Sequence, residues 1–160
     1  MGSRVGIGFD AHPFAAGRAL LLGGVAILHE SGLEGHSDGD ALLHALTDAV
    51  LGAAGAGSIG DHFPPSDPAW KGADSATFLR KAVELARIRG YSVGNVDAVV
   101  VAEAPKLAPH VPAIRARIAE ILGVSPEAVS VRGTSSNGLG FPGRRDGLAA
   151  MAVALLTDGS

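Results

Sequence analysis

Two segments of the sequence bring histidines and carboxylates together at short spacing. The first is Asp10-Ala11-His12, which follows an apolar run from Val5 to Phe9 that predicts a strand. Because alternate residues of a strand project from the same side, Asp10 and His12 are expected to point together. One carboxylate and one imidazole there, with one distant histidine, would supply the three protein ligands of a catalytic zinc that keeps its fourth position open.

The second segment, His36–His44, holds two histidines and two aspartates. It opens the most regular helical pattern in the chain, which predicts a helix over residues 40–55 with Ser37 or Asp38 as its cap. Asp40 and His44 stand about one helical turn apart, so a metal or a phosphate near that face would meet both side chains. For this segment alone, a solvated helix start with one surface histidine is the alternative.

The composition limits the class of protein. The chain has 160 residues, a formal net charge of −3, a pI near 6.0, 47% hydrophobic and 18% charged residues. These values predict one domain over residues 1–160 and argue against a nucleic-acid-binding surface, so small molecules or proteins are the expected partners. Cysteine is absent, which leaves histidine and carboxylate as the strong metal ligands.

No segment has the pattern of a signal peptide or of a membrane span. The longest unbroken apolar run, Leu148–Leu156, is far shorter than the roughly 20 residues that cross a bilayer. We therefore expect a cytoplasmic protein with no membrane partner. Aromatic residues make up only 4% of the chain while glycine numbers 23, so one chain would have a thin core and burial against identical neighbours is expected.

Apolar periodicity predicts a sheet with helices. Runs on either side of Gly23-Gly24 predict a hairpin of Arg18–Leu22 and Val25–Leu28. Helical spacing predicts helices from Asp74 to Gly90 and over Val111–Leu122. Together with the first strand, three further runs predict a four-stranded sheet backed by the helices: Val96–Ala102, expected to be buried on both faces, Val129–Arg132 and Leu148–Leu156.

A polar segment, Ser58–Gly72, has three prolines and no apolar period, and is predicted to be a loop of functional length. His62 and Asp67 are candidate ligands in it, with a solvated His62 as the alternative. Trp70, the single tryptophan, is expected to anchor the loop as a lid or to plug the core.

Two later segments offer groups that bind phosphate. Lys106 follows the fixed backbone of Pro105 and is either a phosphate contact or a solvated lysine. Gly133–Arg145 is rich in hydroxyls, glycines and arginines, which fits a phosphate cradle, because backbone N–H groups and hydroxyls can ring an oxyanion. A flexible surface loop is the alternative for that segment.

Several motifs in the chain, in colinear order from about Arg4 to Leu156, match one known family. They are Gly-Phe-Asp-Ala-His, Gly-His-Ser-Asp-Gly-Asp-Ala-Leu-Leu-His-Ala-Leu-Thr-Asp-Ala, Trp-Lys-Gly-Ala-Asp-Ser, Gly-Asn-Val-Asp-Ala, Ala-Pro-Lys and Leu-Gly-Phe-Pro-Gly-Arg. Together they closely resemble the 2-C-methyl-D-erythritol 2,4-cyclodiphosphate synthases of non-mevalonate isoprenoid biosynthesis. The resemblance implies an α+β fold with a four-stranded sheet, helices on one side and a small hairpin, assembled as a homotrimer with active sites between subunits. It implies conversion of 4-diphosphocytidyl-2-C-methyl-D-erythritol 2-phosphate to the 2,4-cyclodiphosphate and CMP.

The resemblance also assigns site residues. Asp10, His12 and His44 match the family's zinc ligands, and His36 and Ser135 match its catalytic positions. The matched substrate-binding positions are Asp10, His12, His36, Ser37, Ser58, Ile59, Gly60, Phe63, Asp67, Ala102, Pro105, Lys106, Leu107, Ala108, Thr134, Ser135, Asn137, Phe141 and Arg144. A second divalent ion, Mg²⁺ or Mn²⁺, is expected on the substrate diphosphate. Phe9, Phe141 and Arg144 match positions at the trimer channel, where a prenyl diphosphate could bind.

Three positions depart from the family pattern. Ser58 stands where the family usually has Asp, Ser135 where it has Thr, and Asn137 where it has Glu. Ser135 keeps a hydroxyl, whereas Ser58 and Asn137 each remove a carboxylate. The alternative function is therefore a trimeric zinc- and nucleotide-binding homologue with impaired catalysis. A zinc hydrolase is a third hypothesis, for which no residue is clearly placed as the base.

Overall fold

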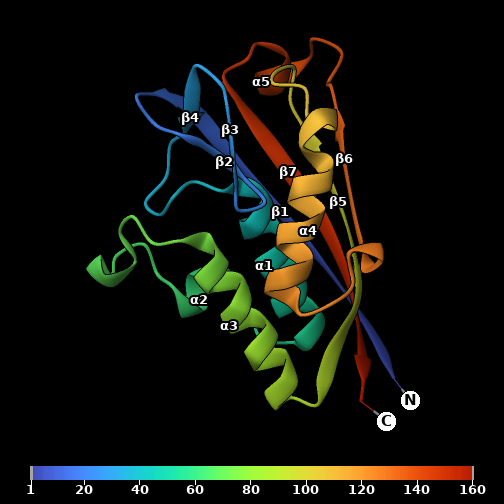
Figure 1. Cartoon of the computed structure of the whole chain (residues 1–160). Coiled ribbons are helices and arrows are strands. Elements are labelled where there is room, and N and C mark those ends of the chain that lie inside the picture. The colour runs from blue at the N-terminus through green and yellow to red at the C-terminus, as the bar shows by residue number, and fades with distance from the viewer. Residues whose placement is uncertain (1, 160) are drawn as a thin grey trace.

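The computed structural model of the chain describes residues 2–159, in which helices cover one face of a mixed β-sheet (Figure 1). The sheet runs in the order β4-β1-β7-β5-β6. Its strands are β1 (Ser3–Ala16), β4 (Ser31–Leu33), β5 (Tyr91–Val101), β6 (Val129–Thr134) and β7 (Gly147–Asp158). β5 and β6 are parallel, and the other neighbours are antiparallel. This architecture is the α+β fold that the resemblance implies.

The sheet has five strands, so the prediction of four was wrong. β1 pairs with β7 from Ser3 to Pro13, and its last residues, Phe14–Ala16, pair with the short strand β4. β4 is the tripeptide Ser-Gly-Leu, which is too short to show an alternating apolar pattern. The four long strands were predicted, and so was the hairpin, which forms from β2 (Leu20–Leu22) and β3 (Val25–Ile27).

Three long helices lie together on one side of the sheet in Figure 1: α1 (Ala41–Ala54), α3 (Ser75–Ile88) and α4 (Val111–Leu122). The remaining helical segments are short: α2 (Ile59–His62), η1 (Pro68–Trp70), η2 (Ala108–His110), η3 (Pro126–Ala128) and α5 (Gly140–Gly143). α4 has the predicted bounds. Among the described residues, none of the helices has the length and apolar character to cross a membrane.

Glycines in β1 let α1 pack directly on the strand backbone. A Cβ at Gly8 would lie 1.8 Å from the Ala45 carbonyl oxygen, and one at Gly6 would lie 2.0 Å from the Ala49 carbonyl oxygen. Only glycine fits at such separations. The close approach brings the residues of the first turns of α1 against β1, and this is the arrangement that sets His44 beside Asp10 and His12.

The opposite face of the sheet is exposed and apolar. Along β1, Val5, Ile7 and Phe9 are 56–67% exposed, and on the neighbouring strand β7 Met151 and Val153 are 40% and 43% exposed. In β5 the alternate residues from Val96 to Val100 are buried and those between them are half-buried. The prediction that β5 is buried on both faces is therefore wrong for the chain by itself, because helices cover only one face.

Candidate active site

A carboxylate and two imidazoles converge where β1 meets α1. The Asp10 Oδ2 atom lies 2.7 Å from His12 Nε2 and 3.0 Å from His44 Nδ1, and the two ring nitrogens are 3.3 Å apart. Within residues 2–159, these three side chains make the one cluster of histidine and acidic groups with ligand atoms close enough to share a metal ion. This group of three side chains, the candidate metal-ligand site or metal cluster, joins the strand motif and the helix motif that the sequence singled out.

Each of the two imidazole rings has a hydrogen-bond partner on the side away from Asp10. These partners leave the nitrogen that faces Asp10 with a free lone pair. His12 Nδ1 lies 2.6 Å from the Glu34 carbonyl oxygen, which can only accept, so Nδ1 carries the hydrogen and Nε2 is free. His44 Nε2 lies 2.7 Å from Ser75 Oγ. When Nε2 donates to that hydroxyl, Nδ1 is free to bind a cation. Metal-binding histidines commonly have such partners.

The electrostatics of the cluster also favour a cation. Burial of Asp10 raises its pKa, but hydrogen bonds that His12 and His44 donate to it when their rings are protonated outweigh that effect and lower the pKa to about 2. The hydrogen bond to Asp10 in turn raises the pKa of His12, against the effect of burial. Three electron-pair donors within 3.3 Å of one another repel unless a proton or a metal lies between them. One oxygen and two nitrogens fit a divalent ion such as zinc.

Asp40 has a structural role, which corrects two predictions. Asp40 itself, and not Ser37 or Asp38, is the N-terminal cap of α1, where it accepts from the Leu43 N–H at 3.0 Å. Its carboxylate is fully buried and also accepts from the N–H groups of Gly23 and Gly24 at 3.0 and 2.7 Å. It therefore fastens the hairpin turn to α1 and does not face the metal cluster with His44.

A cavity of about 200 Å³ adjoins the metal cluster. Its lining residues come from the predicted site and from an aromatic group behind it: His12, His36, Ser37, His44, Ile59, Gly60, Phe63, Pro65, Trp70 and Phe78. The Trp70 ring meets Phe63 edge to face at 5.0 Å between centroids, and Phe63 lies 4.5 Å from Phe78. Trp70 thus anchors the loop over 58–72 at the cavity, as one of the two alternatives predicted.

The other candidate ligands in this loop do not join the group of Asp10, His12 and His44. His62 Nε2 lies 2.7 Å from the Ala56 carbonyl oxygen, and Asp67 caps η1 by accepting from the Ala69 N–H at 2.9 Å. Ser58 stands at the N-terminus of α2, where its hydroxyl and its N–H both donate to Asp61. Asp67 still lies beside the site, since its carbonyl oxygen is 3.4 Å from His36 Nε2.

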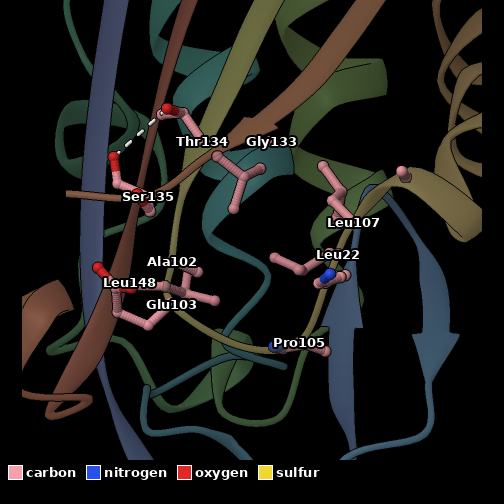
Figure 2. A pocket seen from close by; sticks show the side chains of 12 residues that line it. Leu22, Ala102, Glu103, Pro105, Leu107, Gly133, Thr134, Ser135 and Leu148 are labelled. Atoms are coloured by element: carbon pink, nitrogen blue, oxygen red, sulfur yellow. Dashed lines mark hydrogen bonds between the residues drawn. The ribbon is translucent and has the colours of Figure 1, made fainter. Parts of the chain in front are cut away.

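A second cavity of about 290 Å³ lies between the ends of β5 and β6. Its walls include Ala102, Glu103, Pro105, Lys106, Leu107, Ala108, Thr134 and Ser135. In the view of Figure 2, Ser135 and Glu103 lie on the left of this pocket, and Leu107, Leu22 and Pro105 lie on its right. The residues from Ala102 to Ala108 that were matched to substrate binding are therefore gathered at one place, together with Thr134 and Ser135. The lining residues of this cavity and of the cavity at the metal cluster do not overlap.

Six predicted substrate-binding residues line neither cavity: Asp10, Ser58, Asp67, Asn137, Phe141 and Arg144. Asn137 and Arg144 are exposed, and Arg144 Nε donates to Asp146 Oδ2 at 2.9 Å. Phe141 lines a separate hollow with His12 and Pro13. Asn137 has φ 55° and Gly138 has φ 76°, and the Leu139 N–H donates to the Ser136 carbonyl at 3.1 Å, so residues 136–139 form a turn with two left-handed central residues.

Sequence reasoning missed the residue that holds this turn. Glu103 Oε1 accepts from the N–H and the hydroxyl of Ser136 at 3.2 and 3.3 Å, and from the Gly138 N–H at 3.2 Å. The hydrogen bond from Gly138 is the main cause that lowers the pKa of Glu103. No local pattern marks this residue, because its partners are more than thirty positions away along the chain. Ser75 was missed for the same reason, since its partner His44 lies 31 positions away along the chain.

Comparison with known proteins places the chain in a family. The model of the YgbB family matches residues 3–157. The 2-C-methyl-D-erythritol 2,4-cyclodiphosphate synthase of Thioalkalivibrio sulfidiphilus is 56% identical over 96% of both chains. The bifunctional enzyme IspD/IspF of Hyphomonas neptunium is 60% identical over 96% of this chain, which spans 40% of that relative.

Solved structures agree with the sequence relatives. A 2C-methyl-D-erythritol-2,4-cyclodiphosphate synthase in its CDP-bound form superposes with a TM-score of 0.89 at 39% identity, covering 96% of this chain and all of the other. The bifunctional IspDF from Campylobacter jejuni superposes with a TM-score of 0.96 at 40% identity, over 99% of this chain and 43% of that one. The chain therefore belongs to the YgbB family, that of the 2-C-methyl-D-erythritol 2,4-cyclodiphosphate synthases.

Proposed function

We propose that the chain converts 4-diphosphocytidyl-2-C-methyl-D-erythritol 2-phosphate to 2-C-methyl-D-erythritol 2,4-cyclodiphosphate and CMP, in non-mevalonate isoprenoid biosynthesis. One observation carries the proposal: Asp10, His12 and His44 converge beside a cavity in a chain more than half identical to synthases of that name. The residues that differ from the family pattern do not include these three.

One zinc ion per chain is proposed to bind at Asp10 Oδ2, His12 Nε2 and His44 Nδ1, because the hydrogen bonds on the far sides of both rings leave these atoms as acceptors. When bound, zinc supplies a Lewis acid that polarises a phosphoryl oxygen. His36 and Ser37 line the same cavity. We assign them to the phosphate and erythritol end of the substrate, together with Ile59, Gly60 and Phe63 of the anchored loop.

The cytidine end of the substrate is proposed to lie in the second cavity. CDP is present in the solved structure of a relative that covers 96% of this chain. The cavity combines apolar walls, such as Pro105 and Leu107, with the cation of Lys106 and the hydroxyls of Thr134 and Ser135. Apolar walls suit a base, while the cation and the hydroxyls suit phosphate oxygens.

The chemical step is an intramolecular phosphoryl transfer. An oxygen of the 2-phosphate forms a bond to the β-phosphorus while the bond from that phosphorus to the bridging oxygen breaks, and CMP leaves with the electron pair. Because the nucleophile is already an anion, the chain need not supply a strong base. Its residues position the reacting groups and neutralise charge, with Lys106 and Ser135 on the diphosphate and His36 as transition-state donor.

A second divalent ion, Mg²⁺ or Mn²⁺, is proposed to bind together with the substrate diphosphate, where it would help to neutralise charge. Asn137 offers it a neutral carbonyl oxygen where relatives usually have a carboxylate, so this ion would be held mainly by phosphate oxygens and water. Asn137 is exposed and its N–H donates to Ser135 Oγ at 3.2 Å. The same position motivates the alternative function, a homologue that binds zinc and nucleotide without efficient turnover.

A homotrimer is proposed to assemble the complete site. The metal cluster and the nucleotide pocket have no lining residue in common, and the outer face of β1 and β7 exposes a row of large apolar side chains. Such a face is typical of a subunit contact. Phe9 and Phe141 are proposed to take a prenyl diphosphate in a channel on the threefold axis, with Arg144 on its phosphate. Light scattering that gives the mass of one chain at micromolar concentration would contradict the trimer.

The experiment that tests the function is substrate turnover by the purified protein with Zn²⁺ and Mg²⁺. We expect one CMP released for each cyclodiphosphate formed, and none from His44→Ala, since that change removes a zinc ligand. Zinc and CDP binding without any CMP release would favour the binding homologue. Release of a linear phosphate product, from attack by water, would favour a hydrolase.

A further inference from the structure

The side of the His44 ring away from the metal cluster faces a buried hydroxyl and a carboxylate. His44 Nε2 lies 2.7 Å from Ser75 Oγ and 3.1 Å from Ser37 Oγ. Ser75 is the first residue of α3 and is fully buried. Its hydroxyl makes a short hydrogen bond to Asp38 Oδ1, and its N–H donates to Asp38 Oδ2 at 2.8 Å. His44, Ser75 and Asp38 are therefore linked by a series of hydrogen bonds from the ring to the carboxylate.

The available hydrogens determine which group donates and which accepts in this series of hydrogen bonds. The Ser75 hydroxyl has one hydrogen, and an ionised carboxylate can only accept. The hydrogen therefore points to Asp38, and Ser75 Oγ faces His44 with its lone pairs. The ring can complete this arrangement only by donating from Nε2, which leaves Nδ1 unprotonated toward Asp10 and His12.

The carboxylate of Asp38 is itself held in place. It accepts from the Asp40 N–H at 3.0 Å, and the Asp38 N–H donates to the Ala73 carbonyl at 3.1 Å. Between the same two segments, the Gly72 N–H donates to the His36 carbonyl at 2.7 Å. These bonds tie the segment before α1 to the segment before α3, so the hydroxyl that faces His44 has little freedom to turn away.

We propose that Asp38 and Ser75 are positioning residues that hold His44 in the tautomer required for metal binding. This inference rests on the proposed zinc site at Asp10, His12 and His44. Neither residue belongs to the group of candidate metal ligands or lines the adjoining cavity, and both would act through the ring of His44. Loss of such a partner of a metal-binding histidine typically weakens metal affinity by about 10- to 100-fold.

The test is the zinc dissociation constant of the metal-free protein, measured by competition with a chromophoric chelator. Ser75→Ala should weaken zinc binding by about 10-fold or more, and Ser75→Thr, which keeps the hydroxyl, should restore most of it. Thr77→Ala is the matched control: it removes a hydroxyl from the exposed side of the same helix and should leave the constant unchanged. A constant for Ser75→Ala within twofold of the natural protein would overturn the proposal.

A second measurement begins with the natural protein, so its first result does not depend on the folding of a variant. In the metal-free natural protein, at a pH where the imidazoles are neutral, ¹⁵N chemical shifts should show His44 protonated at Nε2, and Asp38→Asn should shift the ring toward the other tautomer. Protonation of His44 at Nδ1 in the natural protein would contradict the positioning role of Asp38 and Ser75. His44→Ala separates the two proposals. Zinc binding that survives this change would contradict the zinc site itself. Zinc binding that is lost in His44→Ala but kept in Ser75→Ala would contradict only the positioning role.

Discussion

Asn137 stands where the backbone favours asparagine over glutamate. Its φ of 55° lies in the left-handed region, which asparagine adopts more readily than longer side chains, and Gly138 continues the turn with φ 76°. The family's usual glutamate would cost roughly 1 kcal/mol of backbone strain in this conformation. The backbone conformation therefore gives a local reason for asparagine at position 137, where the proposed second ion would meet a neutral oxygen in place of a carboxylate.

We expect Asn137→Glu to lower the concentration of Mg²⁺ or Mn²⁺ that gives half-maximal turnover by roughly tenfold, equivalent to about 1.4 kcal/mol of added metal affinity. The physical reason is that a carboxylate binds a hard cation more strongly than a neutral amide does. Asn137→Gln is the matched control, since it brings a side chain of the same length without the charge. Metal titrations that coincide for Glu, Gln and the natural residue would show that position 137 does not hold the ion.

Single residues were predicted well where type and spacing suffice and poorly where distant backbone decides. Asp10, His12 and His44 come together as predicted because strand and helix periodicity fix their directions. The role of Asp40 could not be seen, because its partners are the N–H groups of Gly23 and Gly24 in a separate hairpin. Spacing alone cannot tell a buried cap from a ligand on the same helical face.

At the scale of elements, Glu103 joins the end of β5 to the turn that carries Asn137. Its carboxylate accepts two N–H groups of that turn, and these hydrogen bonds lower its pKa below the ordinary 4.5. The sign follows directly. The bonds stabilise the turn fully above the unfolded pKa near 4.5, and their contribution is lost as the pH falls through the lower folded value.

We therefore expect Glu103→Ala to abolish hydrogen-exchange protection at the Ser136 and Gly138 amides and to raise KM more than it lowers kcat, since the turn adjoins the nucleotide pocket. In the natural protein, both amide chemical shifts should follow one acidic titration with a midpoint below 4.5. Glu84→Ala, which removes an exposed carboxylate on α3, should change neither the protection nor KM. Unchanged protection in Glu103→Ala would refute the role given to this residue.

The contact between β1 and α1 gives a prediction with opposite signs at two glycines. Gly8→Ala puts a Cβ where only 1.8 Å separates it from the Ala45 carbonyl oxygen, so α1 must move away from β1. We expect a loss of about 1–3 kcal/mol of unfolding free energy and weaker zinc binding, because His44 precedes Ala45. Gly52→Ala has ordinary contacts at 3.9 Å and should stabilise the helix by up to about 1 kcal/mol. Thermal unfolding of both variants tests this pair, and equal shifts would contradict it.

The long elements were predictable and the short ones were not. α4 matches its predicted bounds, and β7 was assigned as a strand despite its alanine content. β4, α2 and η1 were not predicted, because three or four residues are too few to show a periodic pattern of apolar residues. Side-chain packing also shapes the segment over 58–72, since the Trp70 ring contacts Phe63 of the same segment and Phe78 of α3.

At the scale of the whole molecule, one chain has two separate cavities, proposed above as half-sites, and an apolar sheet face that no helix covers. The few aromatics and many glycines of the sequence predicted a thin core and burial against identical neighbours, but they could not show which face of the sheet is left open. The exposed row on β1 and β7 answers that question. A single domain over residues 1–160 stays a prediction, as does the trimer that would cover this face and join the half-sites.

The most direct test of a shared site mixes two inactive variants. His44→Ala lacks the metal half and Lys106→Ala lacks the nucleotide half, so each should release almost no CMP from the substrate. After co-refolding in equal amounts, random trimers should recover about a quarter of natural turnover, because that share of interfaces pairs one intact metal half with one intact nucleotide half. A mixed sample that assembles as trimers yet stays as inactive as its parents, while the natural protein turns over, would contradict a site built from two subunits.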